Sequence, residues 1–399
     1  RKFFQDVHLW LGLSSGLIVI AICLSGTIYV FNTELTERAA SHLYKVEVPE
    51  NGAKLSVDSL ASIVQQKTGA QIASVLIPEA ANRTYQFAVK VKGKERNVTW
   101  MINPYTGLVL GNSGEKNGTK EFMGTMFSLH RWLLLDKIEK PIIGDLPNRK
   151  LGSIITGTAT IIFTLGCLTG LLIWFPKKIR HWRQGLKIKF RANWKRLNHD
   201  LHNTLAFYSL IFLLLMGLTG PQWSFEWYRE GLQKTLGTYK SKDAPKEKKL
   251  LSKVGGDIIP PKAQLASIVN TAKSALPFDG DLNVTLALDT MGTVNVARYH
   301  RGFFASPAAD RITLDQYSLV VLKREIFKEK PTNERIAGSI KALHVGNVYG
   351  MFTKILYFIA CLIATSLPIT GTIIWINKWK KKLARAQSTR RMENVVALD

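Results

Sequence analysis

Four long uncharged apolar runs restrict the fold of this chain more than any other feature of its sequence. Each run contains no Asp, Glu, Lys or Arg and is near the roughly 20 residues that a membrane-spanning helix needs. The runs are Leu9 to Phe31, Leu151 to Phe175, Leu201 to Phe225 and Ile355 to Asn377. The sequence therefore predicts an integral membrane protein with four spanning helices, and it excludes a disordered or fibrous chain.

The distribution of basic residues predicts how these helices are oriented. The chain has 399 residues and a formal net charge of +25. Residues 176–196 hold nine Lys or Arg and no acid, and residues 378–399 hold seven against two acids. By the positive-inside tendency both segments, and both termini, face the cytoplasm, and the two long connections lie outside. Basic side chains facing anionic lipid account for the net charge, so membrane lipids are expected as partners and nucleic acid is not.

The two halves of the chain repeat one another. The glycine follows the histidine by eighteen positions in both halves, from His8 to Gly26 and from His202 to Gly220, so these segments align without a gap. The aligned pairs are His8 with His202, Gly26 with Gly220, His130 with His344, and Gly170 with Gly371. Each half is then one copy of span, outer domain, histidine helix and span. Because each copy crosses the membrane twice, an axis roughly along the membrane normal is expected to relate them.

Each outer domain is predicted to have an α+β fold. Residues 56–67 and 262–274 have the pattern of amphipathic helices. Alternating residues predict strands at 85–91, 98–102 and 108–110 in the first domain and at 282–288, 293–299 and 312–314 in the second. The fold class predicted is an α-helical membrane protein with four transmembrane helices in two pseudo-symmetric halves, plus two extracytoplasmic α+β domains.

These patterns give a set of predicted boundaries. The segments are 1–31 (first span), 32–120 (first outer domain), 121–150 (histidine-bearing helix and loop), 151–175 (second span), 176–197 (basic cytoplasmic loop), 198–225 (third span), 226–337 (second outer domain), 338–377 (histidine-bearing segment and fourth span) and 378–399 (basic cytoplasmic tail).

Four of the eight histidines form two candidate pairs at the membrane boundaries. His8 and His202 open the first and third spans, whereas His130 and His344 precede the second and fourth. Bis-histidine haem ligation needs two imidazoles from different helices that face each other across the macrocycle, and a two-fold axis supplies this arrangement. A histidine at a helix end is also often a structural residue. The pairs predict two haem b groups, which are noncovalent because the sequence has no Cys-X-X-Cys-His.

His199 is a weaker candidate ligand. It lies three residues before His202 on one helix face, so the two cannot be opposite ligands of one haem. The equivalent position in the first half is Gln5.

The glycines that follow Ser or Thr near the span ends are candidate haem-packing residues. A rise of 1.5 Å per residue places Gly26 and Gly220 near the level of the outer histidines, and Gly170 and Gly371 near the inner ones. A porphyrin face or a closely packed helix explains a glycine there equally well.

Other metals suit the sequence less well. Zinc usually needs three or four close ligands, and no cysteine lies near the histidines. Cys23, Cys167 and Cys361 all fall inside predicted spans, so we interpret them as small buried apolar residues.

Several motifs together resemble the PepSY-associated transmembrane proteins. They are Asp-X-His at residues 6–8 and 200–202, Leu129-His130-Arg131-Trp132, Asn103-Pro104-Tyr105-Thr106-Gly107 and Trp174-Phe175-Pro176. The resemblance implies a protein of the bacterial inner membrane whose PepSY-like outer domains lie in the periplasm. It also implies a link to iron uptake, because some members are haem-containing reductases that release iron from ferric siderophores in the periplasm. The second half departs from the pattern at Leu343-His344-Val345-Gly346 and at residues 315–318.

The function expected from these features is transmembrane electron transfer that reduces a ferric siderophore or other ferric chelate, which makes the chain a haem-dependent reductase. No Gly-X-Gly-X-X-Gly is present, so the donor is expected to be another protein, a soluble cofactor or a quinol. Arg131 is expected to bind a haem propionate or a lipid phosphate. The alternatives are a non-catalytic PepSY module that binds a peptide or protein, and a haem-containing quinol oxidoreductase subunit.

Overall fold

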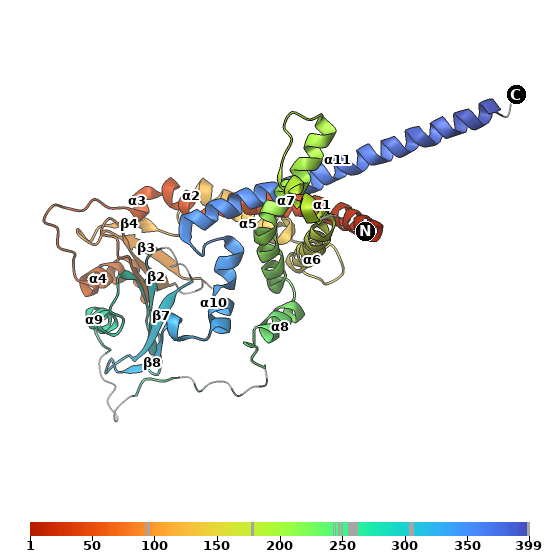
Figure 1. Cartoon of the computed structure of the whole chain (residues 1–399). Helices are drawn as coiled ribbons and strands as arrows, with labels where there is room; N and C mark the ends of the chain where they lie inside the picture. Colours follow the sequence, from red (N-terminus) through yellow and green to blue (C-terminus); the bar gives the residue numbers. More distant parts are fainter. Residues whose placement is uncertain are drawn as a thin grey trace.

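A bundle of four long helices forms one end of the molecule, and a single β-sheet forms the other (Figure 1). The structure is a computed structural model. It describes residues 1–396 except 92, 94–95, 177–178, 242, 244, 246–247, 249, 254–261 and 303–306, and it describes only the backbone of 179, 181 and 389–396.

The four predicted spans are confirmed as helices that are long and apolar enough to cross a membrane. They are α1 (Lys2–Tyr29), α6 (Asn148–Trp174), α7 (Trp194–Thr219) and α11 (Gly350–Val396). Each helix packs against two others, in the cyclic order α1, α6, α7, α11. The chain is therefore a membrane protein whose bundle brings the first and second halves into contact along two seams.

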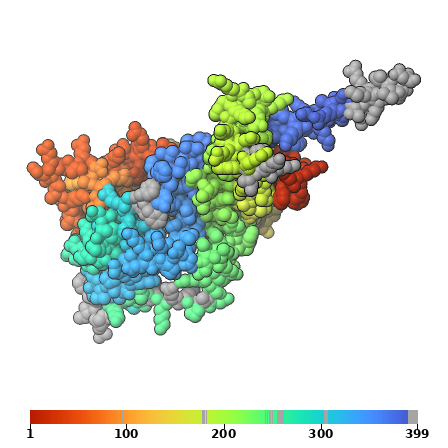
Figure 2. All heavy atoms as spheres, in the orientation of Figure 1, coloured from red at the N-terminus to blue at the C-terminus, as the bar shows by residue number. Residues whose placement is uncertain are grey.

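Helix α11 is longer than the predicted span. It continues without a break past Asn377 to Val396 and projects beyond the other helices (Figures 1 and 2). Residues 372–396 contain no Gly or Pro and hold seven Lys or Arg, which favour helix. Residues 378–396 of the predicted basic tail are thus a helical extension of the fourth span, and the last three residues of that tail lie outside the described residues.

The sheet has eight antiparallel strands in the order β4-β3-β2-β1-β5-β6-β7-β8. The strands are β1 (Gln71–Ile77), β2 (Tyr85–Lys90), β3 (Val98–Ile102), β4 (Val109–Asn112), β5 (Gly280–Thr285), β6 (Thr293–His300), β7 (Ala309–Asp315) and β8 (Val321–Glu325). Strands β1 and β5 pair from Ser74 opposite Thr285 to Ile77 opposite Leu282. The two outer segments, which the sequence predicts as two domains, therefore share one sheet.

Two helices cover this sheet and complete its core. They are α4 (Val57–Thr68) and α9 (Leu265–Ala275), close to the predicted ranges. Their buried residues, such as Leu60 and Ile268, pack with buried strand residues such as Phe87 and Val284 in one continuous hydrophobic core.

The two halves use the same turn with different residues. The side chain of Asn103 accepts hydrogen bonds from the N–H groups of the second and third residues after it, and Asp315 does the same in the second half. Gly107 ends the first turn at φ +73°, whereas Leu319 adopts φ +59° in the second. The predicted turn is present, and the second half reproduces it without its glycine.

Two helices connect the sheet with the bundle. They are α5 (Gly118–Trp132), which ends two residues after His130, and α10 (Thr332–Val345), which ends one residue after His344. The remaining helices are α2 (Asn32–Ala39), α3 (Ser41–Tyr44), α8 (Glu226–Thr235) and the short 3₁₀ segments Leu135–Lys137, Ile179–Leu186, Gly220–Trp223 and Phe327–Glu329. The two connecting helices hold their histidines against the sheet-side ends of the spans.

Candidate functional site

The bundle brings the four predicted histidines together as two pairs. The ring centroids of His130 and His344 are 6.2 Å apart at the end of the bundle nearer the sheet, and we call these the sheet-side pair. Those of His8 and His202 are 6.3 Å apart at the other end, and we call these the tail-side pair. Eighteen residues of α1, about 27 Å by helix rise, separate the two levels. Each pair joins one helix of the first half to one of the second.

Hydrogen bonds indicate the same tautomer at three of these imidazoles. Nδ1 of His8 lies 3.0 Å from the carbonyl oxygen of Gly166, and Nδ1 of His130 lies 2.9 Å from that of Ile22. A carbonyl oxygen only accepts, so both Nδ1 atoms carry the hydrogen. Nδ1 of His344 lies 3.0 Å from the hydroxyl of Thr219, which donates to the carbonyl of Leu215 and so accepts from the imidazole.

The fourth imidazole follows the same rule. Nδ1 of His202 lies 2.9 Å from the hydroxyl of Thr370, and that hydroxyl donates to the carbonyl of Ser366. Nδ1–H therefore donates at all four positions, which leaves the lone pair on each Nε2. In the described part of the chain no hydrogen bond engages any of these Nε2 atoms.

The distance between paired rings suits one metal ion between them. Imidazole nitrogens bind a metal at about 2.0 Å, and each nitrogen lies about 1.1 Å from its ring centroid, so shared ligation holds two centroids about 6.2 Å apart. The observed separations are 6.2 and 6.3 Å. The interplanar angles of 62° and 76° are compatible with two rings that share one metal axis. The residues present therefore fit a bis-histidine haem at each level.

Each predicted glycine lies against one histidine ring. A Cβ atom would meet the ring at 3.1 Å at Gly26 (His130) and Gly170 (His8), at 3.2 Å at Gly371 (His202) and at 3.4 Å at Gly220 (His344). The levels predicted for the glycines are thus those of the structure. The direct neighbour of each glycine is an imidazole on another helix, so the missing side chain makes room for the candidate ligand.

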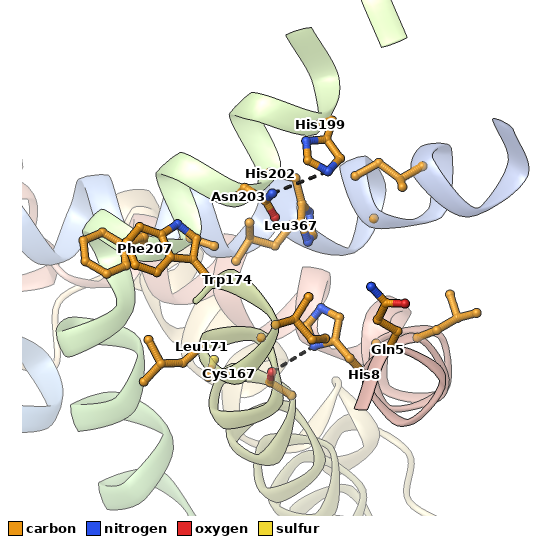
Figure 3. A pocket seen from close by; sticks show the side chains of 18 of the residues that line it. Gln5, His8, Cys167, Leu171, Trp174, His199, His202, Asn203, Phe207 and Leu367 are labelled. Atoms are coloured by element: carbon orange, nitrogen blue, oxygen red, sulfur yellow. Dashed lines mark hydrogen bonds between the residues drawn. The ribbon is translucent and has the colours of Figure 1, made fainter. Parts of the chain in front are cut away.

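A cavity of about 810 Å³ surrounds the tail-side pair (Figure 3). Its size is within the range usual for cofactor sites, roughly 300–1,000 Å³. Trp174, which stacks on Phe207 with a centroid distance of 3.9 Å, forms part of its apolar wall. The basic residues that line it are Arg1, Lys2, Arg196 and Lys378. The cavity thus combines apolar walls with basic groups that suit carboxylates, and Asp6 and Asp200 also line it.

Arg131 and a tryptophan flank the sheet-side pair. Trp223 packs edge-on against His344 at 4.9 Å, and Arg131 donates a 3.3 Å hydrogen bond to the carbonyl of Trp223. Among the described residues no carboxylate forms an ion pair with Arg131. Burial and the nearby charge of Arg149 lower the pKa of Arg131. An anionic group beside this pair would stabilise the guanidinium.

Burial also keeps the sheet-side imidazoles neutral. It lowers the pKa of His130, and together with the neighbouring His130 and Arg131 it lowers the pKa of His344 to about 3. A neutral imidazole retains the lone pair that metal binding requires.

His199 belongs to neither pair. It lies on the wall of the tail-side cavity, one turn of α7 before His202 (Figure 3). Its Nε2 lies 3.5 Å from Asn203, and its Nδ1 is buried without a hydrogen-bond partner.

The sequence interpretation missed the hydroxyl groups that orient the ligands. Thr169, Thr219 and Thr370 each precede one of the predicted glycines and lie within hydrogen-bond distance of an Nδ1 atom. The repeated Thr-Gly dipeptide was the available signal, but the prediction used only its glycine. Among the described residues no three or more His, Cys, Asp or Glu side chains converge as a metal site, so candidate ligation rests on the histidine pairs.

A helical membrane protein with an external sheet and two facing histidine pairs is the class that this geometry defines. The family model described as the PepSY-associated TM region matches residues 5–378, and the chain therefore belongs to that family. None of the curated proteins matches the chain closely enough to count as a relative.

Proposed function

We propose that this protein binds two haem b groups, one between the imidazoles of each pair, and carries electrons across a membrane to reduce a ferric siderophore or another ferric chelate. The observation that carries the proposal is the arrangement of four histidines in two pairs, with ring centroids 6.2 and 6.3 Å apart. A single structural histidine at a helix end does not require a second imidazole opposite it.

The residues of the chain prepare each site for an axially ligated haem. The carbonyl and hydroxyl acceptors hold the hydrogen on Nδ1, so that the lone pair of Nε2 is free to bind a metal. Such acceptors also raise the basicity of the imidazole and so favour the ferric state. When bound, a bis-histidine haem supplies reversible one-electron chemistry without a change of ligands.

The direction of transfer follows from the proposed topology. The basic segments at 176–196 and 378–399 support a cytoplasmic location of the tail side. We therefore propose that the sheet lies in the periplasm and that the chain spans the bacterial inner membrane. Each electron that reaches the sheet side reduces one ferric ion to ferrous. A ferrous ion binds hard oxygen donors more weakly, so its chelate releases the metal. Arg131 is suited to a haem propionate at this level.

A visible spectrum of the purified full chain tests the proposal. We expect a Soret band that shifts on addition of dithionite, and two haems per chain by pyridine haemochrome analysis. We also expect anaerobic mixing of the reduced protein with a ferric chelate to oxidise it without added quinone. A chain that stays without haem after haem supplementation would refute the proposal and favour a PepSY module that binds a peptide or protein. Oxidation that requires a quinone would favour the respiratory quinol oxidoreductase.

A further inference from the structure

The mouth of the tail-side cavity extends past the histidine pair toward the end of the bundle. His199 is three residues before His202 on α7, about 4.5 Å farther out by helix rise. Gln5, which is the repeat equivalent of His199, and Asn203 line the same region. Figure 3 shows these side chains on the cavity wall beside the histidine pair, which leaves a polar region just outside the pair.

His199 has unused hydrogen-bonding capacity in this region. Its Nδ1 atom is buried and forms no hydrogen bond, although the imidazole is 45% exposed and the carboxylate of Asp200 lies 3.7 Å away, within ion-pair distance only. Asp200 is instead held by Arg196, whose Nε lies 2.8 Å from it. The contact of Nε2 with Asn203, at 3.5 Å, is at the limit of a hydrogen bond. Buried polar atoms almost always have partners, so this imidazole suits a polar group of a ligand.

One wall of the cavity near His199 is apolar, whereas its charged neighbours are Arg196, Asp200 and Lys378. Leu367, Ile374 and Trp375 on α11 line the cavity opposite α7. A ligand that fits must therefore be largely apolar and carry one or two oxygens that donate or accept a hydrogen bond. The basic residues of the cavity would also suit an anionic soluble cofactor, but a quinol is largely apolar and already resides in the membrane, at the level where this cavity opens.

We propose that the mouth of the tail-side cavity binds the headgroup of a quinol, with His199 as the hydrogen-bond partner of its hydroxyl oxygen and Asn203 beside it. The site rests on the proposed function, for which it names the electron donor. Oxidation of one quinol to the quinone releases two electrons and two protons. The two electrons reduce two ferric ions outside to ferrous, and the two protons leave to water at the open end of the cavity.

Binding of a quinone to the full-length protein in lipid nanodiscs tests this site independently of turnover. Isothermal titration with a short-chain ubiquinone should show saturable binding. His199→Ala should weaken the affinity about tenfold, as expected from the loss of one buried hydrogen bond. His199→Gln, which introduces the residue of the repeat-equivalent position, should retain part of the affinity. His42→Ala, which changes an exposed histidine of α3, is the matched control and should bind as the native protein does.

Anaerobic reduction by the matching short-chain ubiquinol is the second measurement. The native protein should show reduction in its visible spectrum, and His199→Ala should react about tenfold more slowly while dithionite still reduces it fully. Equal affinity and equal rates in the native protein and His199→Ala would overturn the proposal, as would the absence of saturable binding. Haem without quinone binding would refute this site and leave the proposed function standing. Quinone binding that depends on His199 in a protein without haem would support this site and refute the proposed function.

Discussion

The carboxylate of Asp58 accepts a 2.7 Å hydrogen bond from the backbone N–H of Leu265, which lies in the other half of the chain. Asp58 is in the first turn of α4, and Leu265 is the first residue of α9. The preceding residue, Gln264, makes no side-chain capping bond to α9. A residue of the first half thus caps a helix of the second, because the free N–H groups of a helix start need an acceptor.

The first prediction follows from this contact. Asp58→Ala should destabilise the protein by about 1 kcal/mol, the usual effect of losing a helix cap. The thermal midpoint of the full chain in detergent, followed by tryptophan fluorescence, measures this loss. Glu47→Ala, at an exposed position, is the control. An unchanged midpoint for Asp58→Ala would show that the second half caps α9 by other means.

The second prediction assigns the ligands of each haem. His130→Ala or His344→Ala should remove the haem of the sheet-side pair and leave the other, because each haem needs both axial imidazoles. His8→Ala or His202→Ala should have the converse effect, and His199→Ala should retain both haems. Haem content and a redox titration of each variant provide the measurement. Loss of a haem in His199→Ala, with normal content in His202→Ala, would show that the ligand is misassigned.

The third prediction is a graded effect of glycine substitutions. Gly26→Ala should disturb His130, since the new Cβ atom would lie 3.1 Å from its ring. Overpacking of this kind costs about 1–3 kcal/mol, so haem retention at the sheet-side pair should fall. Gly220→Ala places its Cβ 3.4 Å from His344, an ordinary contact, and should retain haem nearly as the native protein does. Equal retention in the two variants would contradict a spacing role for these glycines.

The fourth prediction concerns the hydroxyl that accepts from His344. Thr219→Val should raise the midpoint potential at the sheet-side pair by roughly 20–60 mV, because a hydrogen bond to Nδ1–H stabilises the ferric state by about 0.5–1.5 kcal/mol. Ser25→Ala is the matched control. Ser25 holds the repeat-equivalent position, but its hydroxyl donates to Ala21 and Ile22 of its own helix, and His130 uses the carbonyl of Ile22. A spectroelectrochemical titration in which both variants shift equally would argue against this role of Thr219.

The fifth prediction tests the orientation in the membrane. Single cysteines at Lys90 on β2 and at Lys187, which follows the 3₁₀ segment Ile179–Leu186, should react differently with an impermeant maleimide. The background for both variants lacks the native Cys23, Cys167 and Cys361. In cells with a permeabilised outer membrane only the cysteine at Lys90 should be labelled. The reverse pattern would invert the topology and the direction of electron flow.

The sequence predicted the spans and the pairing of the histidines because both can be recognised from the order of the residues alone. Uncharged runs determine the four helices, and the spacing of the repeat aligns His8 with His202 and His130 with His344. The sequence did not predict the orientation of each imidazole ring. Whether Nδ1 bonds to a carbonyl, as at His130, or to a hydroxyl, as at His344, depends on rotamers that packing decides.

The sequence analysis did not predict strands β1 and β8, and each omission has a structural reason. In β1 a register shift between Ile72 and Ser74 interrupts the alternation of buried and exposed residues. Strand β8 lies at the edge of the sheet and carries Lys323, Arg324 and Glu325, so it has no apolar alternation to detect. The pairing of β1 with β5 joins residues far apart in sequence, which local patterns cannot specify.

That pairing has a consequence for the order of events during synthesis. Strand β1 is complete at Ile77, whereas β5 begins at Gly280, about 200 residues later. At the usual translation rate of about 5–20 residues per second, β5 is synthesised roughly 10–40 seconds after β1. Throughout that interval the N–H and C=O groups along one side of Ser74 to Ile77 have no strand to bond with, and such an edge is prone to pair with other chains. Until β5 is made, this edge of the nascent chain is therefore exposed to pairing with other chains.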